Sequence, residues 1–266
     1  MASLRRRTQK RRRAILTMVR DETVFLPIWL QYYSRCFASR DIYVYDHGST
    51  DGSVAAARKR CAFQLSVVGH PVFNDFPWYT AFIQRAQREL LESYDVVVFA
   101  EADEILWHPS GLGRYLHAFE RGADQRDAVR ATGWSLWHDR THEPDLDLSR
   151  SIVSQRRYLV RDLLYDKALI TRVPLTYGFG FHWAKECRET DPELMLLHLH
   201  TMDYRLGLQK HERTRAYRDY SSRSIELNQG SGGRLVGDEY AAWFDRAGCE
   251  DRRRPIPPRL LEKRPV

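Results

Sequence analysis

The chain has no long run of apolar residues. Of its 266 residues 43% are hydrophobic, but no stretch approaches the roughly 20 apolar residues that a membrane-spanning helix needs. Behind the basic N-terminus the apolar run extends only from residue 14 to residue 19. A signal peptide has a longer apolar core, of about 7–15 residues, followed by a small-residue cleavage site. We therefore expect neither a transmembrane segment nor a signal peptide, and we expect a cytoplasmic protein.

Cysteine is scarce. The four cysteines are far apart in the sequence, at Cys36, Cys61, Cys187 and Cys249. Zinc sites and disulfide frameworks use closely spaced cysteines. Neither is expected here, and the cysteines are interpreted as reduced thiols in packed positions.

Positive charge is concentrated at the two ends of the chain. The net charge is +7, and basic residues cluster within residues 5–13 and again from residue 252 to residue 264. Terminal charge blocks of this kind are typically solvated arms. We interpret residues 1–13 as a basic disordered arm and residues 251–266 as an extended tail rich in proline and arginine. A peripheral contact with an anionic membrane surface stays open as an alternative.

Strands and helices alternate through the first half of the sequence. Short apolar runs predict strands, and stretches with apolar residues at helical spacing predict helices. Such alternation is typical of βαβ units in a largely parallel sheet. The predicted strands are residues 14–19, 42–46, 65–68 and 96–100, and the predicted helices are residues 23–37, 53–60 and 78–93.

The second half is less regular. It has a polar stretch at residues 138–151, interpreted as a loop over a site, and a glycine-rich break at residues 230–233. We expect one α/β domain over residues 14–250, with a mostly parallel, Rossmann-type sheet flanked by helices. Helices are predicted at residues 112–121 and 204–220, and strands at residues 128–137, 158–160, 168–173 and 194–199.

Carboxylates follow two of the predicted strands directly. Asp46 ends one strand, and Glu101 and Asp103 follow another. In open α/β sheets, ligands bind beyond the carboxyl ends of the strands. Two carboxylates spaced i, i+2 beside a phosphate-bearing ligand form a hard-oxygen site for Mg²⁺ or Mn²⁺. The pattern therefore predicts a nucleotide-diphosphate substrate.

These residues also carry a resemblance. The segments Met18–Glu22, Tyr45–Gly52 and Glu101–Glu104 resemble family 2 glycosyltransferases of the GT-A fold, most closely their short "glycosyltransferase 2-like" branch. The resemblance covers about residues 14–108 and is looser over residues 134–215. It implies a GT-A-like fold in which residues 14–108 bind the nucleotide and residues 109–250 form the acceptor half.

The resemblance also implies an activity. It predicts transfer of a sugar, with inversion, from a nucleotide-diphosphate-sugar to a glycan, lipid-linked or small-molecule acceptor, assisted by Mn²⁺ or Mg²⁺. The sequence departs from the family pattern at two positions. His47 stands where Asp or Asn is usual, and Glu101 replaces the first Asp of the D-x-D motif.

Candidate site residues come from the strand ends and from positions that match the family. Asp103 and His198 are the predicted metal ligands, and His200 would share a strand face with His198. The predicted nucleotide-binding residues are Asp21, Glu22, Asp46, His47, Glu101, Lys167 and Lys210. Arg172 and Arg213 are further candidates for diphosphate contacts. Asp51 is expected to hold a turn or cap a helix instead.

An inverting transfer needs a carboxylate or a histidine to take the proton of the acceptor. Glu186 is the predicted catalytic base. The alternatives are Glu189, Asp191, Asp139 and His182. Three tryptophans are candidates for stacking on a sugar ring, with a core position as the alternative: Trp134, Trp137 and Trp183.

Two other functions stay open. A nucleotidyltransferase acting on a sugar phosphate would also use metal-bound carboxylates, but it usually has a glycine-rich phosphate loop after the first strand. Residues 20–23 contain no glycine. A non-enzymatic binder of nucleic acid or of an anionic surface would use the basic termini. Nucleic acid is disfavoured because the basic clusters lack the interleaved aromatic residues on which bases stack.

Overall fold

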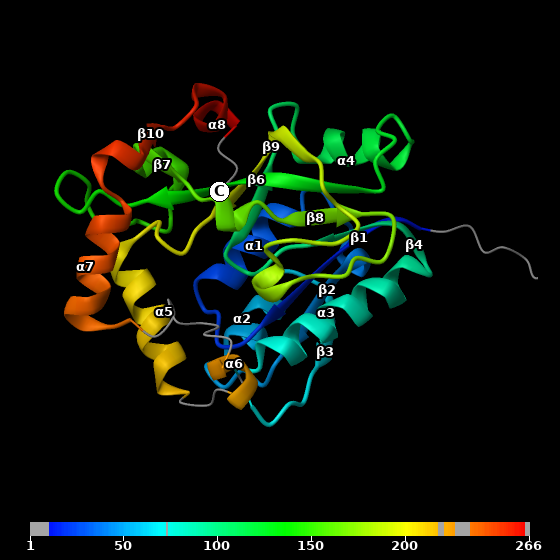
Figure 1. The fold of residues 1–266 in the computed structure, drawn as a ribbon, viewed down its shortest axis with the longest axis horizontal. Coiled ribbons are helices and arrows are strands. Elements are labelled where there is room, and N and C mark those ends of the chain that lie inside the picture. The colour runs from blue at the N-terminus through cyan, green and yellow to red at the C-terminus, as the bar shows by residue number, and fades with distance from the viewer. Residues whose placement is uncertain (1–10, 73, 218–220, 227–234, 264–266) are drawn as a thin grey trace, which may run out of the picture.

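The computed structural model describes residues 11–72, 74–217, 221–226 and 235–263 (Figure 1). The first ten residues of the predicted arm and the glycine-rich break at residues 230–233 lie outside the described residues. Strand β1 (Arg11–Val19) begins three residues before the predicted strand. Arg11 and Arg13 pair with the neighbouring strand in register with Tyr94 and Val96. The sheet therefore includes residues that we had assigned to the arm.

The first half of the chain builds a parallel sheet. Its strands lie in the order β4-β1-β2-β3, and all the pairs are parallel. This confirms the predicted alternation of strands and helices. The elements are β1, α1 (Phe25–Tyr33), β2 (Ile42–Asp46), α2 (Ser53–Arg60), β3 (Gln64–Val67), α3 (Phe76–Leu91) and β4 (Tyr94–Phe99).

The second half extends this sheet with strands of both directions. Strand β8 pairs antiparallel with β4, and β6 lies between β8 and β7. The elements are β5 (Glu104–Trp107), α4 (Leu112–Glu120), β6 (Ala128–Trp137), β7 (Tyr158–Arg161), β8 (Ala168–Thr171), β9 (Thr190–His198), α5 (Tyr204–Ala216), α6 (Ser222–Glu226), α7 (Gly237–Ala247), β10 (Arg253–Pro255) and α8 (Pro258–Lys263).

The strand directions confirm the expected fold class. Strands β1, β2, β3, β4, β6, β9 and β10 run one way, and β5, β7 and β8 run the other way. The fold is an α/β sheet, mostly parallel and flanked by helices. None of the helices that the structure describes is long and apolar enough to cross a bilayer.

The central strands are buried on both faces. Residues 14–17 of β1 and residues 96–99 of β4 have no exposed surface. Strands covered on both faces read as continuous apolar runs, which is why the sequence signal was strong here. The covered middle of such a strand does not accommodate charged side chains, so these come where the strand ends. The carboxylates therefore lie at one edge of the sheet.

The C-terminal tail is part of the domain. We expected an extended tail from residue 251, but β10 pairs with β7, and Ile256 and Leu260 are buried in the core. Pro258 begins α8, a position where proline costs no hydrogen bond. Figure 1 shows β10 and α8, in red, beside β7. Apolar residues spaced between the prolines anchor this segment.

Helices α5 and α7 lie side by side at the left of Figure 1. Helix α7 was not predicted. Its Tyr240 and Phe244 are buried in a second core cluster that also contains Trp137. This contact fixes α5, because Gly207 of α5 lies directly against Tyr240 and against the backbone of His200.

A side chain at position 207 should disturb this contact. A Cβ there would lie 2.8 Å from the carbonyl oxygen of His200 and closer still to the hydroxyl of Tyr240. We expect Gly207→Ala to lower the free energy of unfolding by about 1–3 kcal/mol through overpacking, measured by urea denaturation. Gly113→Ala is the control, since a Cβ in α4 would meet only Cys36 Sγ at 3.8 Å. Equal midpoints for both variants would contradict the prediction.

Candidate active site

A cavity of about 200 Å³ lies at the carboxyl ends of the parallel strands. Val19 of β1, His47 after β2 and Asp103 after β4 contribute to its wall, and α5 closes it. Five of the predicted site residues line it: Glu22, His47, Glu101, Asp103 and Lys210. Residues more than a hundred positions apart in the sequence thus meet at the edge that the strand-end rule predicts.

The cavity holds a compact group of opposite charges. Lys210 Nζ lies 2.8 Å from Asp103 Oδ2 and 3.1 Å from Glu22 Oε1, and an Arg213 nitrogen lies 3.6 Å from Glu22 Oε2. Burial alone would lower the pKa of Lys210, but Asp103 and Glu22 outweigh it and raise that pKa. Lys210 is thus held charged beside the two carboxylates.

The two carboxylates titrate differently. Burial raises the pKa of Glu22 above its ordinary value. Burial would do the same to Asp103, but Lys210 and His198 outweigh it and hold the pKa of Asp103 well below its usual range. Asp103 is therefore the more firmly ionised carboxylate and the better ligand for a cation.

Two histidines behind Asp103, His200 and His211 (the histidine relay), are hydrogen-bonded in a way that fixes their tautomers. His211 Nδ1 lies 3.0 Å from the carbonyl oxygen of Leu235, and a carbonyl can only accept, so His211 Nδ1 carries the proton. Burial lowers the pKa of His211 to about 3, so its Nε2 is unprotonated. That Nε2 accepts from His200 Nε2 at 2.6 Å. His200 Nδ1, 3.7 Å from Asp103 Oδ2, is therefore left with its lone pair.

A lone pair and a carboxylate oxygen that face each other can both ligate a cation. Burial lowers the pKa of His200 to about 4, so this nitrogen carries no proton near neutral pH. His198 Nε2 lies 3.4 Å from the same oxygen. One ligand atom from each of Asp103, His198 and His200 lies within 4.8 Å of the others. Outer partners that fix a histidine tautomer are typical of metal sites, and this donor set fits a divalent cation.

The position of the two histidines agrees with the expected strand face. Their rings stack at 5.6 Å between centroids, and His198 also stacks on Tyr165 at 3.9 Å. His200 was an open alternative in the sequence, and His211 was not predicted at all. The spacing of His200 and His211 gives no signal, because a strand end and a helix bring them together.

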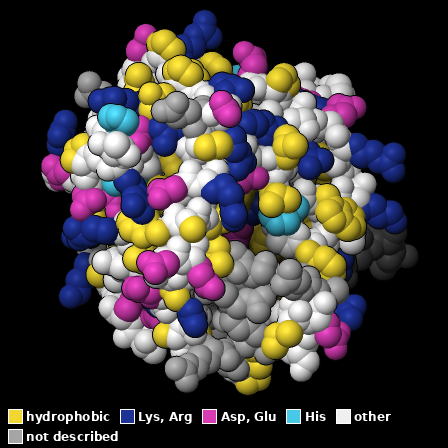
Figure 2. All heavy atoms as spheres, turned by 60° about the vertical axis from the view of Figure 1, so that its left-hand side comes forward, with side chains coloured by type: hydrophobic (Ala, Val, Ile, Leu, Met, Phe, Trp, Pro, Cys, Tyr) yellow, Lys and Arg dark blue, Asp and Glu magenta, His cyan; other side chains and the backbone are white. Residues whose placement is uncertain are grey.

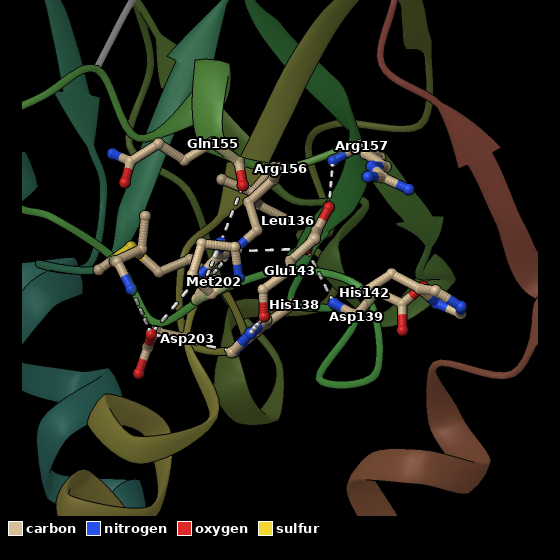
Figure 3. Close-up of polar contacts among 12 residues, drawn as sticks. Leu136, His138, Asp139, His142, Glu143, Gln155, Arg156, Arg157, Met202 and Asp203 are labelled. Atoms are coloured by element: carbon tan, nitrogen blue, oxygen red, sulfur yellow. Dashed lines mark hydrogen bonds and ion pairs between the residues drawn. The ribbon is translucent and has the colours of Figure 1, made fainter.

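A second cluster of similar composition does not suit a metal. His138, Asp145 and Asp203 also place ligand atoms within 4.8 Å of one another. His138 Nδ1 accepts from the backbone N–H of Tyr204, and Nε2 donates to the carbonyl of Glu143, so no lone pair remains. Figure 3 shows His138 beside Glu143 and Asp203. This cluster is a closed hydrogen-bond network.

Lys167 lies below the cavity wall and does not line it. Its Nζ is 2.6 Å from both Glu101 Oε2 and Glu104 Oε1. Burial would lower the pKa of Lys167, but the two carboxylates outweigh it and raise that pKa. Lys167 therefore has a structural contact that holds Glu101, which lines the cavity, and its expected nucleotide contact stays a prediction. Glu104, which also accepts from the backbone N–H of Glu101, was not predicted.

Asp21 and Asp46 shape the loop after β2 and do not line the cavity. Asp21 Oδ1 accepts from the backbone N–H groups of Thr50 and Asp51, at 2.6 and 3.0 Å, and the Tyr217 hydroxyl donates to Oδ2. Asp46 accepts from the backbone of Ser49 at 2.9 Å. These bonds hold both carboxylates in the loop, and their predicted nucleotide contacts stay a prediction.

Asp51 holds the turn after β2, as expected. Asp51 accepts from the backbone N–H of Ser53 at the start of α2, and Gly48 has a φ of 76°, in the left-handed region. His47 reaches the cavity, where its ring lies 5.0 Å from that of Trp78. Burial lowers the pKa of His47.

Glu186 does not reach the cavity. It accepts from the backbone and the hydroxyl of Thr176, at 2.6 and 2.8 Å, in an exposed loop. The position of Glu186 gives its role as the base no support, and that role stays a prediction. None of the alternatives is among the described residues that line the cavity either: Glu189, Asp191, Asp139 and His182.

Of the remaining candidate residues, one lines the cavity and the others do not. Arg213 lines the cavity, whereas Arg172 is bound to backbone carbonyls near α4. None of the three candidate tryptophans lines the cavity; Trp137 is in the second core cluster and Trp183 is exposed.

Several further cavity residues were not singled out, among them Asn74, Tyr79, Thr214 and Tyr217. The positions of Thr214 and Tyr217 could have been inferred. They follow Lys210 by four and seven residues, which places all three on one face of a helix.

The face drawn in Figure 2 has no single sign of charge. Lys and Arg side chains lie there among acidic and hydrophobic ones. A nucleic-acid-binding face would be expected to concentrate basic side chains. This face therefore does not favour the nucleic-acid alternative.

Comparisons with known proteins give limited matches. No protein-family model and no curated protein matches the chain. Solved structures of glucosyl-3-phosphoglycerate synthase from Mycobacterium tuberculosis are similar to it. The complex with Mn²⁺, uridine diphosphate and glucosyl-3-phosphoglycerate has 14% identity and a TM-score of 0.33, over 46% of this chain and 44% of that chain. Another structure of the synthase has 19% identity and a TM-score of 0.36, over 46% and 45%. The chain thus spans less than half of the synthase, and these matches establish neither family nor substrate.

Proposed function

We propose that this chain is a glycosyltransferase of the GT-A fold, related to family 2, that uses a nucleotide-diphosphate-sugar and Mn²⁺ or Mg²⁺. The observation that carries the proposal is the arrangement at Asp103. Asp103 is an ionised carboxylate that lines the cavity at the carboxyl ends of the parallel strands, and it faces the lone pair of His200, which lies behind the cavity wall. The sequence motifs after β1, β2 and β4 support the same reading.

Asp103, His198 and His200 would hold the divalent cation. When bound, the cation would neutralise charge that develops on the departing nucleotide diphosphate. Lys210 and Arg213 lie on the same side of the cavity as Asp103 and Glu22. Their charges would attract the phosphates and orient them, Lys210 as a point charge and Arg213 as a planar fork.

The rest of the cavity would hold the nucleoside and sugar. Glu101 is oriented by Lys167 and by the hydroxyl of Tyr79, 3.5 Å from its Oε1. A carboxylate held in this way can accept hydrogen bonds from sugar hydroxyls. His47 and Asn74 line the cavity together with Phe76. They would provide a mixed polar and aromatic wall for the base.

The proposal predicts metal-dependent nucleotide binding. Purified protein is melted with UDP-, GDP-, ADP- and dTDP-sugars, each with Mn²⁺ or with EDTA. A true donor at about 100 times its Kd should stabilise the protein by about 2.7 kcal/mol, with Mn²⁺ present. Asp103→Asn should remove this stabilisation and should leave the fold intact, because Asp103 lies beyond the end of β4.

The matched control is Asp145→Asn, which alters the exposed carboxylate of the second cluster. It should keep the wild-type response. Stabilisation by a nucleotide-sugar that survives both EDTA and Asp103→Asn would show that the metal site is misassigned. No response to any nucleotide-sugar would remove the proposed function.

A further inference from the structure

The connector at residues 199–203 joins two parts of the candidate site. The metal-binding histidines lie at the end of β9, where the connector begins, and Lys210 and Arg213 lie on α5, which follows it. The backbone N–H of Leu199 donates to the carbonyl oxygen of Asp103 at 2.8 Å. The path of this connector therefore determines how the histidines and the α5 cations face Asp103.

Arg156 holds the other end of the connector. Its side chain has no exposed surface. Nε donates to the carbonyl oxygen of Met202 at 2.5 Å, and Nη2 donates to Asp203 Oδ2 at 3.3 Å. Figure 3 shows the guanidinium among these partners. Nη1 donates to two more carbonyls, of Pro144 at 3.1 Å and of Gln155 at 2.8 Å.

Asp203 links Arg156 to the first turn of α5. While Oδ2 contacts Arg156, Oδ1 accepts from the backbone N–H of Leu206 at 3.0 Å and caps the helix. His138 Nδ1 accepts from the backbone of Tyr204 in the same turn, at 3.1 Å. Lys210 follows Asp203 by seven residues, which is two helical turns, so it lies on the same face of α5. The cap therefore sets where Lys210 points.

We infer that Arg156 is a positioning residue for the candidate site, acting through Met202 and Asp203 on both β9 and α5. It does not touch the cavity itself. Only a guanidinium has enough donors, in a fixed plane, to hold two carbonyls, the connector and the cap together. What the site binds rests on the proposed function; how Arg156 orders the connector does not.

The first experiment measures this order without any ligand. Hydrogen exchange is followed by mass spectrometry on peptides that cover residues 199–216 of the metal-free protein. Arg156→Met removes every donor, and we expect exchange at Tyr204, Leu206 and Gly207 to become about tenfold faster. Arg156→Lys should lie between Arg156→Met and wild type. Arg157→Met is the matched control, because Arg157 is the next residue in the chain and its own side chain is exposed.

The second experiment measures the consequence for the metal site. Mn²⁺ binding is titrated by the electron paramagnetic resonance signal of the free ion, at a temperature where circular dichroism shows each variant folded. We expect Arg156→Met to weaken Mn²⁺ binding by about 10–100-fold, the range typical of residues behind metal ligands. Arg157→Met should bind as wild type does.

The outcomes separate the two proposals. Wild-type protein that binds no Mn²⁺ would remove the proposed metal site, and the exchange data would still decide the role of Arg156. Unchanged exchange over residues 199–216 in Arg156→Met, or faster exchange confined to residues 138–157, would overturn the inference. If Arg156→Met does not fold, Arg156→Lys and Asp203→Asn are measured in the same two ways. Wild-type exchange in both of these variants would overturn it equally.

Discussion

Replacing Lys167 by methionine is expected to lower the free energy of unfolding by about 3–5 kcal/mol, the loss typical of a broken buried ion pair. Lys167 has 1% of its side chain exposed, and Glu104, which it contacts at 2.6 Å, has none. Methionine fills much of the same volume but leaves Glu104 buried without its cation. An uncompensated buried charge costs more than the pair contributed, which is why the effect should be large.

Urea denaturation at pH 7 measures the loss. Lys185→Met is the control, since Lys185 is exposed and belongs to the loop around η4 (Phe179–Phe181). It should change stability by less than about 0.5 kcal/mol. The double variant Lys167→Met with Glu104→Gln should recover part of the loss, because it removes the stranded charge as well. A loss under about 1 kcal/mol in Lys167→Met would mean that the pair is not buried as described.

The first half of the fold could be predicted because its strands are covered on both faces. Val96–Phe99 is a continuous apolar run bounded by polar residues, and it folds as the core of β4. In such a strand the apolar sequence pattern matches the buried position in the fold. The antiparallel strand β5 was missed, since its four residues directly follow the motif and are all buried, without alternation. Its partner β9 is about ninety residues away.

The part of the candidate site that directly follows the parallel strands could be predicted from the sequence. Glu101 and Asp103 reach the cavity because they follow β4. The sequence does not show which charges are already satisfied. Asp21 and Asp46 follow strands equally well, yet they accept from backbone N–H groups of the loop and do not line the cavity. Glu186 was chosen because the family resemblance places the base well beyond the D-x-D motif, but Glu186 does not line the cavity.

The histidine relay illustrates the remaining limit. Its two bonds join a carbonyl near α7, a side chain of α5 and one after β9. No local pattern encodes a contact between three elements. Yet the relay decides which nitrogen of His200 faces Asp103, and with it the chemistry of the site. Long-range contacts of this kind become visible only when the fold is complete.

The free energy of unfolding of the metal-free protein is expected to fall as the pH drops from about 6.5 to about 4. His200 has an ordinary pKa of 6.5 and a folded pKa of about 4. Between these values the unfolded chain binds a proton that the folded one does not, so stability is lost as pH decreases. At 1.36 kcal/mol per pKa unit the loss from His200 is about 3 kcal/mol. His211, with its pKa lowered to about 3, extends the loss further.

Urea denaturation between pH 7.5 and 4.5, with EDTA present, tests this expectation. The raised pKa of Glu22 acts in the opposite direction, so the comparison of variants matters more than the absolute slope. His200→Gln should flatten the dependence of unfolding free energy on pH, because an amide does not titrate. His117→Gln, at a half-exposed histidine, should keep the wild-type slope. Parallel curves for wild type and His200→Gln would mean that folding leaves the pKa of His200 unchanged. The burial of a neutral His200 imidazole beside Asp103, on which the assigned tautomer depends, would then be wrong.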